Sequence, residues 1–508
     1  MFHKLARALV IIVFTAAAAH ADGAAPAPLR TAIVEGSTVF APGDFFAAYR
    51  AELGKPLAPE SIRAIGESIA ALYRDAGYAR PTVQSDQTLS GQGILKIRIH
   101  EPLVTRVTIQ GSPGKHRESL QRISSQVTAS RPLRRDVIPR ALAEMRRIPG
   151  LSVTPETRRD ASQPNAWELV LDADFSPVSG VVRVNNRGTE QIGPAFVIGQ
   201  VAVNDLAGRG EKFGLMFSTA ADTGEYRSGG LFVDAPVGAN GGRGMLLVFR
   251  SDSAPNEAPV NLTDEYRRER AMLSWTRPFG AGGERSWVAS AALEAEDLVV
   301  DRDGLDVRHD RLRILETGLR AGWRAGDATR LSAHFKLRKG FDILGAGLRA
   351  DDLTVDNREL EFVALDLQAG SFTRFSSAWS LRTELFAQYS RDVLPDSERF
   401  KIGGERLGRG FEVAEIAGDR GLGAKLVLRR ELAAGGKLGR PSFYALYDIG
   451  AAWKEDLSGR ESAATGGTGF ALDGARWSGY VEAVTPLTRA DIEGKQSTGI
   501  FAELAFRF

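Results

Sequence analysis

The chain has 508 residues, of which 43% are hydrophobic and 25% are charged, and this length is sufficient for more than one domain. Its 65 basic and 63 acidic residues leave a formal net charge of +2, which provides no strong field for holding nucleic acid, so nucleic acid is not expected as a partner. The sequence contains no cysteine, which excludes disulfide bonds and thiolate metal sites.

Residues 1–21 have the pattern of a secretory signal peptide. Basic residues precede the apolar stretch 8–19, and Ala19-His20-Ala21 matches a cleavage site built from small residues. The apolar stretch is too short to cross a bilayer, and no later segment has the roughly 18 apolar residues of a membrane helix. We therefore expect the mature chain, which begins with a short segment at 22–29, outside the cytoplasm and without a helical anchor.

Residues 30–176 show helix and strand patterns that occur twice in the same order. The clearest helix is expected at 59–76, where Pro59 suits the first turn, an apolar stripe recurs at helical spacing, and Gly77 follows as a C-cap. The expected strands lie at 31–36, 94–100, 104–110, 151–158 and 167–173, and the other expected helices at 42–53, 116–127 and 136–148. Two β-α-α-β-β units, 30–102 and 103–176, each of about 70 residues, are large enough to be small α+β domains.

Residues 177–508 contain no convincing helix and consist of alternating segments separated by turn residues. In the segments 379–389 and 443–453, one face is apolar and the other carries charged residues well inside the strand. A soluble β-sandwich gives the same alternation, but aromatic residues at both ends of these segments are typical of a membrane barrel. At roughly 20 residues per strand and loop, the region accommodates about 16 strands. The sequence therefore predicts a mainly β protein, a transmembrane antiparallel β-barrel of about 16 strands preceded by two small α+β domains.

The end of the chain, 499–508, is a further alternating strand. Phe506 and Phe508 fall on its apolar face, whereas Glu503 and Arg507 fall on the other face. A final strand that ends on Phe resembles the signal by which outer-membrane barrels are delivered and inserted. We therefore expect Phe506 and Phe508 to form a C-terminal insertion signal, and the alternative is the terminal strand of a soluble sandwich.

No pattern for an active site is found in the sequence. The glycines at 208–214 resemble a phosphate loop but lead into a strand, so a turn is expected there. The acidic segment 301–306 has its glycine too early for a calcium loop, so an extracellular turn is expected. The six histidines lack zinc-ligand spacing, and no hydrolase arrangement of the Gly-x-Ser-x-Gly type occurs. We therefore expect no catalytic residue, no cofactor and no metal ion, and hence no enzyme.

Three stretches carry motifs that occur together in one family. The stretch 69–78, which ends in Tyr-x-x-x-Gly-Tyr, and the strand that follows at 89–97 look like a polypeptide-transport-associated (POTRA) domain. The stretch 401–411 ends in Arg409-Gly410-Phe411 and looks like an inward-folded pore loop. Tyr447-Asp448-Ile449-Gly450 looks like the strand motif that receives the loop arginine. With this order and spacing, the chain resembles the two-partner secretion transporters, the outer-membrane exporters of filamentous haemagglutinins and haemolysins, in the superfamily that also contains barrel-assembly insertases.

The resemblance implies an outer-membrane protein of a Gram-negative bacterium with two POTRA domains in the periplasm. These domains would bind one large exoprotein, and the unfolded exoprotein would then pass through the barrel pore; adhesin, haemolysin and toxin cargoes all remain open. The implied partners are the exoprotein, the outer-membrane lipid and, during biogenesis, the barrel-assembly machinery. The alternative is a barrel-assembly insertase, although such relatives usually carry more than two POTRA domains. A passive porin would need neither the POTRA domains nor the Arg-Gly-Phe loop.

For the site, the resemblance implies a contact between Arg409 at the loop tip and Asp448, with Gly450 in the same motif. Period-two counting from Phe443 places Asp448 on the lumen side, and an arginine presents a planar fork of donors to a carboxylate. The alternative makes Arg409 one of many solvated arginines in a glycine-rich extracellular loop.

The sequence also departs from the family pattern at three places. Gly408 stands where the family often has Val, and Glu101-Pro102 stands where Glu-Gly is usual. Many relatives carry an N-terminal helix that plugs the barrel, and the segment 22–29 is too short for such a plug and its linker. The means by which this pore is closed at rest is therefore left open by the sequence.

Overall fold

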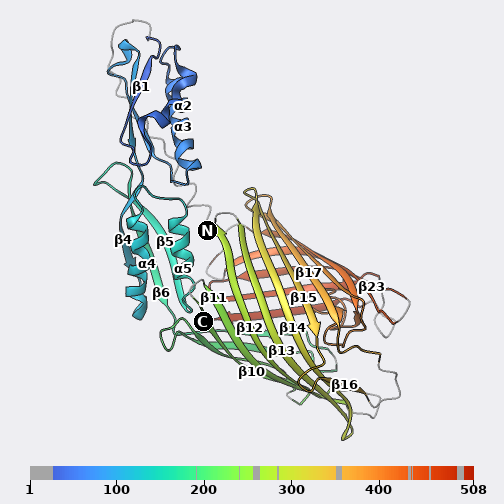
Figure 1. Ribbon diagram of the computed structural model, residues 1–508. Helices are drawn as coiled ribbons and strands as arrows, with labels where there is room; N and C mark the ends of the chain where they lie inside the picture. The colour runs from blue at the N-terminus through green and yellow to red at the C-terminus, as the bar shows by residue number, and fades with distance from the viewer. Residues whose placement is uncertain are drawn as a thin grey trace. The chain divides into compact units, whose positions relative to one another are not determined.

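Figure 1 shows the computed structural model, which describes residues 27–508 apart from 190, 223, 239–240, 256–263, 283–284, 351–356, 433–435, 437–438, 457–458 and 489–496. The chain divides into two compact units, Met1–Phe175 and Ser176–Phe508. The expected signal peptide and most of the segment 22–29 lie outside the described residues. Within the described ranges, no helix is both long enough and apolar enough to cross a membrane.

The first part of the N-terminal unit is a three-stranded sheet packed against helices. Its strand order is β1-β3-β2, with β3 (Ile94–His100) parallel to β1 (Thr31–Glu35) and antiparallel to β2 (Thr82–Asp86). The helix α3 (Pro59–Asp75) begins at Pro59, as expected, and buries an apolar stripe against β3. This core contains Ile62, Ile65, Ile69, Tyr73, Leu95, Ile97 and Ile99.

The helix expected at 42–53 is found as a continuous helical segment over 42–52, made of three successive short helices of which the first and last are 3₁₀. They are η1 (Pro42–Phe45), α2 (Phe46–Tyr49) and η2 (Arg50–Glu52), and a further turn, η3 (Ser90–Gln92), precedes β3. A segment this short gains little from helical hydrogen bonds alone, so tertiary packing decides its form.

Tyr73, near the end of α3, connects the helix to the segment that follows β3. Its hydroxyl donates a hydrogen bond to Glu101 (2.7 Å) and lies 2.8 Å from the Ser37 hydroxyl. Burial raises the pKa of the Tyr73 phenol, so it stays a hydrogen-bond donor at physiological pH. Glu101 also accepts a bond from the Thr38 backbone N–H (2.9 Å). Glu101 therefore connects the end of α3 with the segments that follow β1 and β3.

The second part of the N-terminal unit repeats this arrangement with its own core. Its strand order is β4-β6-β5, with β6 (Ala166–Phe175) parallel to β4 (Leu103–Gln110) and antiparallel to β5 (Leu151–Asp160). The helices are η4 (Gly114–His116), α4 (Arg117–Ala129) and α5 (Val137–Met145). The core contains Leu120, Ile123, Val127, Leu142, Met145, Val153, Leu169 and Leu171. Two small mixed sheets, each with its own hydrophobic core, confirm the expected pair of POTRA-like folds.

The second unit is a closed antiparallel barrel of 16 strands, which confirms the expected fold. The strands are β7 (Val178–Asn185), β8 (Phe196–Asn204), β9 (Lys212–Ala220), β10 (Tyr226–Val237), β11 (Gly242–Ser253), β12 (Asp264–Gly282), β13 (Arg285–Arg302), β14 (Leu305–Ala325), β15 (Thr329–Gly340), β17 (Val363–Arg374), β18 (Trp379–Ser390), β21 (Arg420–Glu431), β22 (Arg440–Trp453), β23 (Glu461–Asp473), β24 (Trp477–Pro486) and β25 (Gly499–Arg507). A further short strand, β16 (Gly347–Ala350), pairs with β14 beyond the end of β15, and β25 pairs with β7 to close the ring.

Side chains of the barrel alternate between the outer face and the lumen. Large apolar side chains such as Leu231, Leu293 and Ile500 lie on the outer face and are 59–66% exposed, as a lipid-facing wall requires. Charged residues such as Glu294 and Glu482 face the lumen and are buried. A soluble sandwich would cover its apolar face with a second sheet. The closed barrel has no such sheet among its described strands, so the sandwich interpretation is wrong.

Chain connectivity distinguishes the two ends of the barrel. The strand β7 begins at Val178, directly after the second α+β domain ends at Phe175, so this end of the barrel is the one that joins the N-terminal unit. We call it the proximal end and the opposite one the distal end. Because successive strands alternate in direction, Phe508 lies at the proximal end and the connection 391–419 lies at the distal end.

Candidate functional site

The connection 391–419, between β18 and β21, packs against the inner wall of the barrel. It contains a two-stranded sheet made by β19 (Phe400–Ile402) and β20 (Ile416–Gly418). Its apolar residues form one buried cluster with three residues of the wall: Phe400, Ile402, Leu407, Phe411 and Ile416 of the connection, and Phe386, Ala452 and Ala463 of the wall. We call this segment the pore loop.

Glycines on the inner wall leave space for the pore loop. A side chain at Gly421 would overlap the Phe400 ring, and one at Gly423 would overlap Leu407. A Cβ at Gly450 would lie 2.9 Å from Ile402 Cδ1. The third position of the Asp-x-Gly motif therefore suits glycine because the loop approaches the strand closely there.

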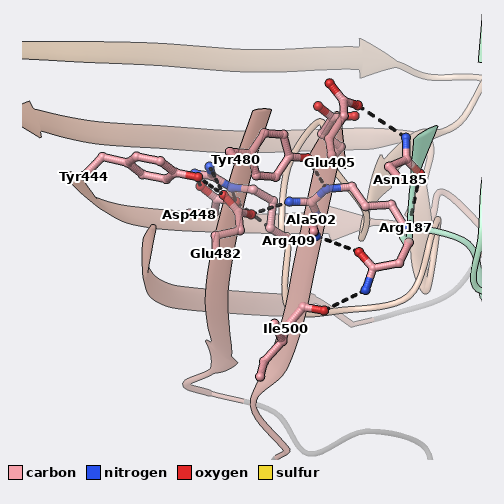
Figure 2. Close-up of polar contacts among 12 residues, drawn as sticks. Asn185, Arg187, Glu405, Arg409, Tyr444, Asp448, Tyr480, Glu482, Ile500 and Ala502 are labelled. Carbon is pink, nitrogen blue, oxygen red and sulfur yellow. Dashed lines mark hydrogen bonds and ion pairs between the residues drawn. The ribbon is translucent and has the colours of Figure 1, made fainter. Parts of the chain in front are cut away.

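Arg409 and Asp448 meet inside the lumen, as Figure 2 shows. Arg409 donates from Nε to Oδ2 (2.9 Å) and from Nη2 to Oδ1 (2.6 Å), so the guanidinium grips both carboxylate oxygens. The backbone N–H groups of Gly408 and Arg409 each donate to Oδ2 (3.2 Å). Asp448 is 0% exposed and the Arg409 side chain 7%. The loop tip is thus held by four hydrogen bonds to one buried carboxylate, and Arg409 is not solvated.

The residues beside Arg409 shape the loop tip around this contact. Gly408 has φ +84°, in the left-handed region, and this conformation suits glycine better than a β-branched residue. At Gly410, a Cβ would lie 3.0 Å from Thr465 Cγ2 and 3.1 Å from the Pro486 nitrogen, so the tip lies directly on the wall. Phe411 is buried in the pore-loop cluster.

A second carboxylate, Glu482 on β24, lies beside the Arg409–Asp448 pair. Its Oε2 is 4.0 Å from Arg409 Nη1 and accepts a hydrogen bond from the Tyr444 hydroxyl (2.7 Å). Its Oε1 is paired with Arg187, which follows β7, and Arg187 Nε also donates to the Tyr480 hydroxyl (2.8 Å). Figure 2 shows these contacts as one network that leads from the loop tip to the first strand of the barrel.

The pore loop has a second set of ionic contacts close to β18. Glu398 makes a two-bond contact with Arg338 of β15, from Nε to Oε2 (2.6 Å) and from Nη2 to Oε1 (2.9 Å). Asp396 pairs with Arg308 of β14 (2.6 Å). The base of the loop is therefore attached to the wall at β14 and β15, and its tip is attached at β22 and β24.

The C-terminal strand closes the barrel at a short seam. The ladder between β25 and β7 runs from Glu503↔Asn185 to Arg507↔Val181. Beyond its distal end, Asn186 extends the seam: its backbone N–H donates to the Ala502 carbonyl (3.3 Å), and its side-chain amide donates to the Ile500 carbonyl (2.9 Å) and accepts from the Ala502 N–H (2.6 Å). At the proximal end, the rings of Phe506 and Phe508 are stacked, with centroids 6.3 Å apart.

The sequence motifs located Arg409, Gly410, Phe411, Asp448 and Gly450, and the structure brings these residues together. Phe506 and Phe508 lie elsewhere, at the seam. Sequence reasoning missed Arg187, Glu482 and the Arg338–Glu398 contact. The only available signal for Glu482 was a charged residue at a lumen position of an alternating strand, which does not reveal its partners.

The sequence model of the haemolysin secretion/activation protein family ShlB/FhaC/HecB matches residues 170–472, more than half of the chain. The outer membrane transporter CdiB of Dickeya dadantii (strain 3937) is 24% identical over 433 residues, which cover 82% of this chain and 75% of the relative. Among solved structures, CdiB from Escherichia coli has a TM-score of 0.71 at 17% identity and covers 98% of this chain and 93% of that one. CdiB from Acinetobacter baumannii has a TM-score of 0.61 at 14% identity, with 96% and 91% covered. The two structural likenesses establish the fold.

Proposed function

The chain belongs to the ShlB/FhaC/HecB family of haemolysin secretion/activation proteins, and from this membership we propose that the anchored pore loop controls the passage of its exoprotein. The protein is a two-partner secretion transporter of the outer membrane and not an enzyme. Its POTRA domains lie in the periplasm, and its partner is a secreted exoprotein. The expected identification of the family is thereby confirmed, and the insertase alternative receives no support.

The single observation that carries the proposal is the burial of the Arg409–Asp448 contact. A guanidinium and a carboxylate removed from water are stable only when their hydrogen bonds are satisfied, and the loop tip supplies four of them to Asp448. Releasing the tip breaks all four together, so the loop has an anchored state and a detached state. We propose that export requires the anchored loop. Its tip is Arg409-Gly410-Phe411, and the part of the barrel wall that holds the tip contains Asp448 and Gly450.

We further propose that the two periplasmic domains, 30–102 and 103–176, bind the unfolded exoprotein by strand addition. Both sheets are open, so β1 and β2 form the edges of the first sheet and β4 and β5 the edges of the second. An extended chain that pairs with such an edge gains backbone hydrogen bonds, while side-chain pockets supply selectivity. An unfolded adhesin, haemolysin or toxin would each supply such an extended chain, so strand addition does not distinguish these cargoes.

The remaining proposed contacts concern the membrane. We propose that the final strand, with Phe506 and Phe508, is the segment that the barrel-assembly machinery recognises during insertion, and that outer-membrane lipid covers the apolar outer face. The barrel, 177–508, presents these aromatic rings at its proximal end, where β25 and β7 meet.

Export is tested by examining the reading frame adjacent to the gene and, where it encodes a large secreted protein, expressing the chain together with that protein. We expect the exoprotein in the medium only when the transporter is present with both periplasmic domains. Accumulation of other outer-membrane barrels in proportion to this protein, without any exported partner, would favour the insertase instead.

A further inference from the structure

Charged residues are distributed unevenly over the outer face of the barrel. On β22, β23, β24, β25, β7, β8 and β9, the described outward-facing residues are all uncharged. On β10 to β14, which lie side by side in Figure 1, outward-facing arginines and carboxylates gather toward the distal end. We call those in the three rows nearest the apolar band the outer charged cluster, and its members are Arg227, Arg250, Asp252, Arg267, Glu269, Asp297, Arg311 and Arg313; Glu265 and Asp301 form the next row toward the distal end.

Strand register brings these residues into neighbouring rows. One row across the strands is Arg227↔Asp252↔Arg267, and the next is Gly229↔Arg250↔Glu269↔Asp297↔Arg311. Three arginines surround one carboxylate: Asp252 lies 3.0 Å from Arg250, 3.6 Å from Arg227 and 3.8 Å from Arg267. The cluster contains five arginines and three carboxylates, and the carboxylates of Glu265 and Asp301 lie directly distal to it. The side chains of Arg227, Arg250 and Arg267 are 51–70% exposed and retain donors for a further anion.

A groove runs directly beneath the cluster on the outer face. In its proximal row, the apolar residues Leu215, Leu231 and Val248 lie level with the small floor residues Ala271 and Ala295 and with Arg313. In its distal row, the small floor residue Gly229 lies level with Arg250, Glu269 and Asp297. At Gly229, the nearest atom to an added Cβ is 3.9 Å away, so the floor is open there. The groove therefore has an apolar side and a charged side.

The level of the groove matches the boundary between lipid tails and headgroups. Along β12, outward-facing apolar residues fill the stretch between Arg277 near the proximal end and Glu269 toward the distal end. At the usual rise and tilt of barrel strands, this stretch is about 20 Å tall, close to the apolar band of an outer-membrane barrel. The proximal end joins the periplasmic domains, so the outer charged cluster lies at the headgroups of the outer leaflet.

We propose that the groove binds a phosphate-bearing glycolipid of the outer leaflet, of the lipid A type. An acyl chain would lie on Leu215, Leu231 and Val248, and a phosphate would accept hydrogen bonds from Arg250 and its neighbours Arg227 and Arg267. Arginine forks match phosphate oxygens, and basic pockets at the membrane surface select anionic headgroups. The three arginines around Asp252 favour an anionic lipid over a zwitterionic phospholipid, and the uncharged outer faces of β22 to β25 and β7 to β9 confine binding to this side of the barrel.

The test uses the purified full-length protein, incubated in detergent with bis-phosphorylated lipid A or with phosphatidylethanolamine and examined by native mass spectrometry. The variant Arg227→Gln/Arg250→Gln/Arg267→Gln removes the proposed phosphate contacts. The matched control Arg277→Gln/Arg285→Gln/Arg430→Gln removes three outward arginines at the proximal ends of strands. Gly229→Leu fills the groove without changing any charge. Heat-modifiable migration on gels verifies that each barrel is folded.

We expect the protein and the matched control to retain lipid A in preference to phosphatidylethanolamine. The triple variant of the cluster should bind lipid A about tenfold more weakly, which is the loss expected from one or two charge-assisted hydrogen bonds. Gly229→Leu should also weaken binding. Equal retention of the two lipids by the unmodified protein, or equal lipid A binding by the cluster variant and its control, would overturn the proposal.

Discussion

Phe508 and Gly180 exchange both of their backbone hydrogen bonds, with Gly180 N to Phe508 O at 2.8 Å and Phe508 N to Gly180 O at 3.1 Å. The Phe508 ring covers the space that a side chain at Gly180 would occupy. The last residue of the chain therefore pairs with the first strand and extends the seam by one rung, which gives Phe508 a structural role in addition to its proposed role as an insertion signal.

Deleting Phe508, or the change Phe508→Ser, is expected to lower the amount of folded barrel in the outer membrane severalfold, while export per folded molecule stays near normal. The change removes the terminal aromatic ring and weakens the closing rung without touching the lumen. Heat-modifiable barrel in membrane fractions measures the effect. Leu504→Ser, on the same outer face but inside the strand, is the matched control, and an unchanged barrel level in the Phe508 variants would exclude the insertion-signal role.

Removing residues 30–175 is expected to leave a barrel that inserts and conducts ions but exports nothing. The barrel forms its own closed strand ladder and shares no strand with the N-terminal sheets, so it can fold without them. Conductance in planar bilayers and exoprotein in the medium are the two measurements. A deletion of 30–102 alone shows whether the second domain suffices for binding, and full export by the longer deletion would place recognition elsewhere.

Most of the fold could be predicted because it depends on local periodicity. Pro59, the apolar stripe of α3 and Gly77 predict a helix, and period-two alternation places Asp448 in the lumen. Polar edge strands are harder to predict from sequence. The strand β2 has only one apolar residue, Val83, so no alternating pattern identifies it. The helix expected at 42–53 is present, but its division into 3₁₀ and α turns depends on packing and does not follow from propensity.

Only those residues of the site that belong to a sequence motif could be predicted. Arg409 and Asp448 stand in recognisable patterns, whereas Arg187 and Glu482 are two ordinary charged residues far apart in the chain. Their contact depends on barrel closure, which brings the end of β7 next to β25 and β24. No local pattern encodes this proximity, and the same holds for Glu398 and Arg338.

Glu398→Gln is expected to loosen the base of the pore loop while leaving its tip anchored. Arg338 keeps its contacts to Glu316 (2.6 Å) and Glu294 (3.4 Å), so the substitution removes a loop contact without leaving an unpaired buried charge. Trypsin should cleave the segment 399–409 severalfold faster than in the unmodified protein. Arg382→Ala, an exposed residue on β18, is the control, and identical cleavage rates would show that the base contact does not hold the loop.

Glu482→Gln is expected to reduce export less than Asp448→Ala does. The amide keeps the size of the side chain and can still accept the hydrogen bond from Tyr444, and the four bonds to Asp448 remain. The loss is limited to the ionic contacts with Arg187 and with Arg409, the latter at 4.0 Å. Secreted exoprotein per folded barrel is the measurement. If Glu482→Gln abolished export as completely as Asp448→Ala, the anchoring of the loop tip would depend on Glu482 as much as on Asp448.

Arg409→Ala and Asp448→Ala are each expected to cripple export while the barrel still inserts. Removing either partner leaves the other a buried charge without its main counter-ion and releases the loop tip. Losing a charge-assisted pair of this kind costs on the order of 1.5–3 kcal/mol, which is enough to detach a loop but not to unfold a closed barrel. Barrel folding is verified by heat-modifiable migration, and Arg406→Ala, in the same loop, is the control.

The double variant distinguishes a direct contact from two independent roles. Because one shared contact is proposed, Arg409→Ala/Asp448→Ala should export little worse than either single variant, and the coupling in a double-mutant cycle should account for most of each single effect. Arg409→Lys refines the test: lysine keeps the charge but lacks the fork that reaches both oxygens of Asp448, so it should restore export only in part. Full export by Arg409→Ala, or strictly additive effects in the cycle, would mean that this contact does not control the transporter.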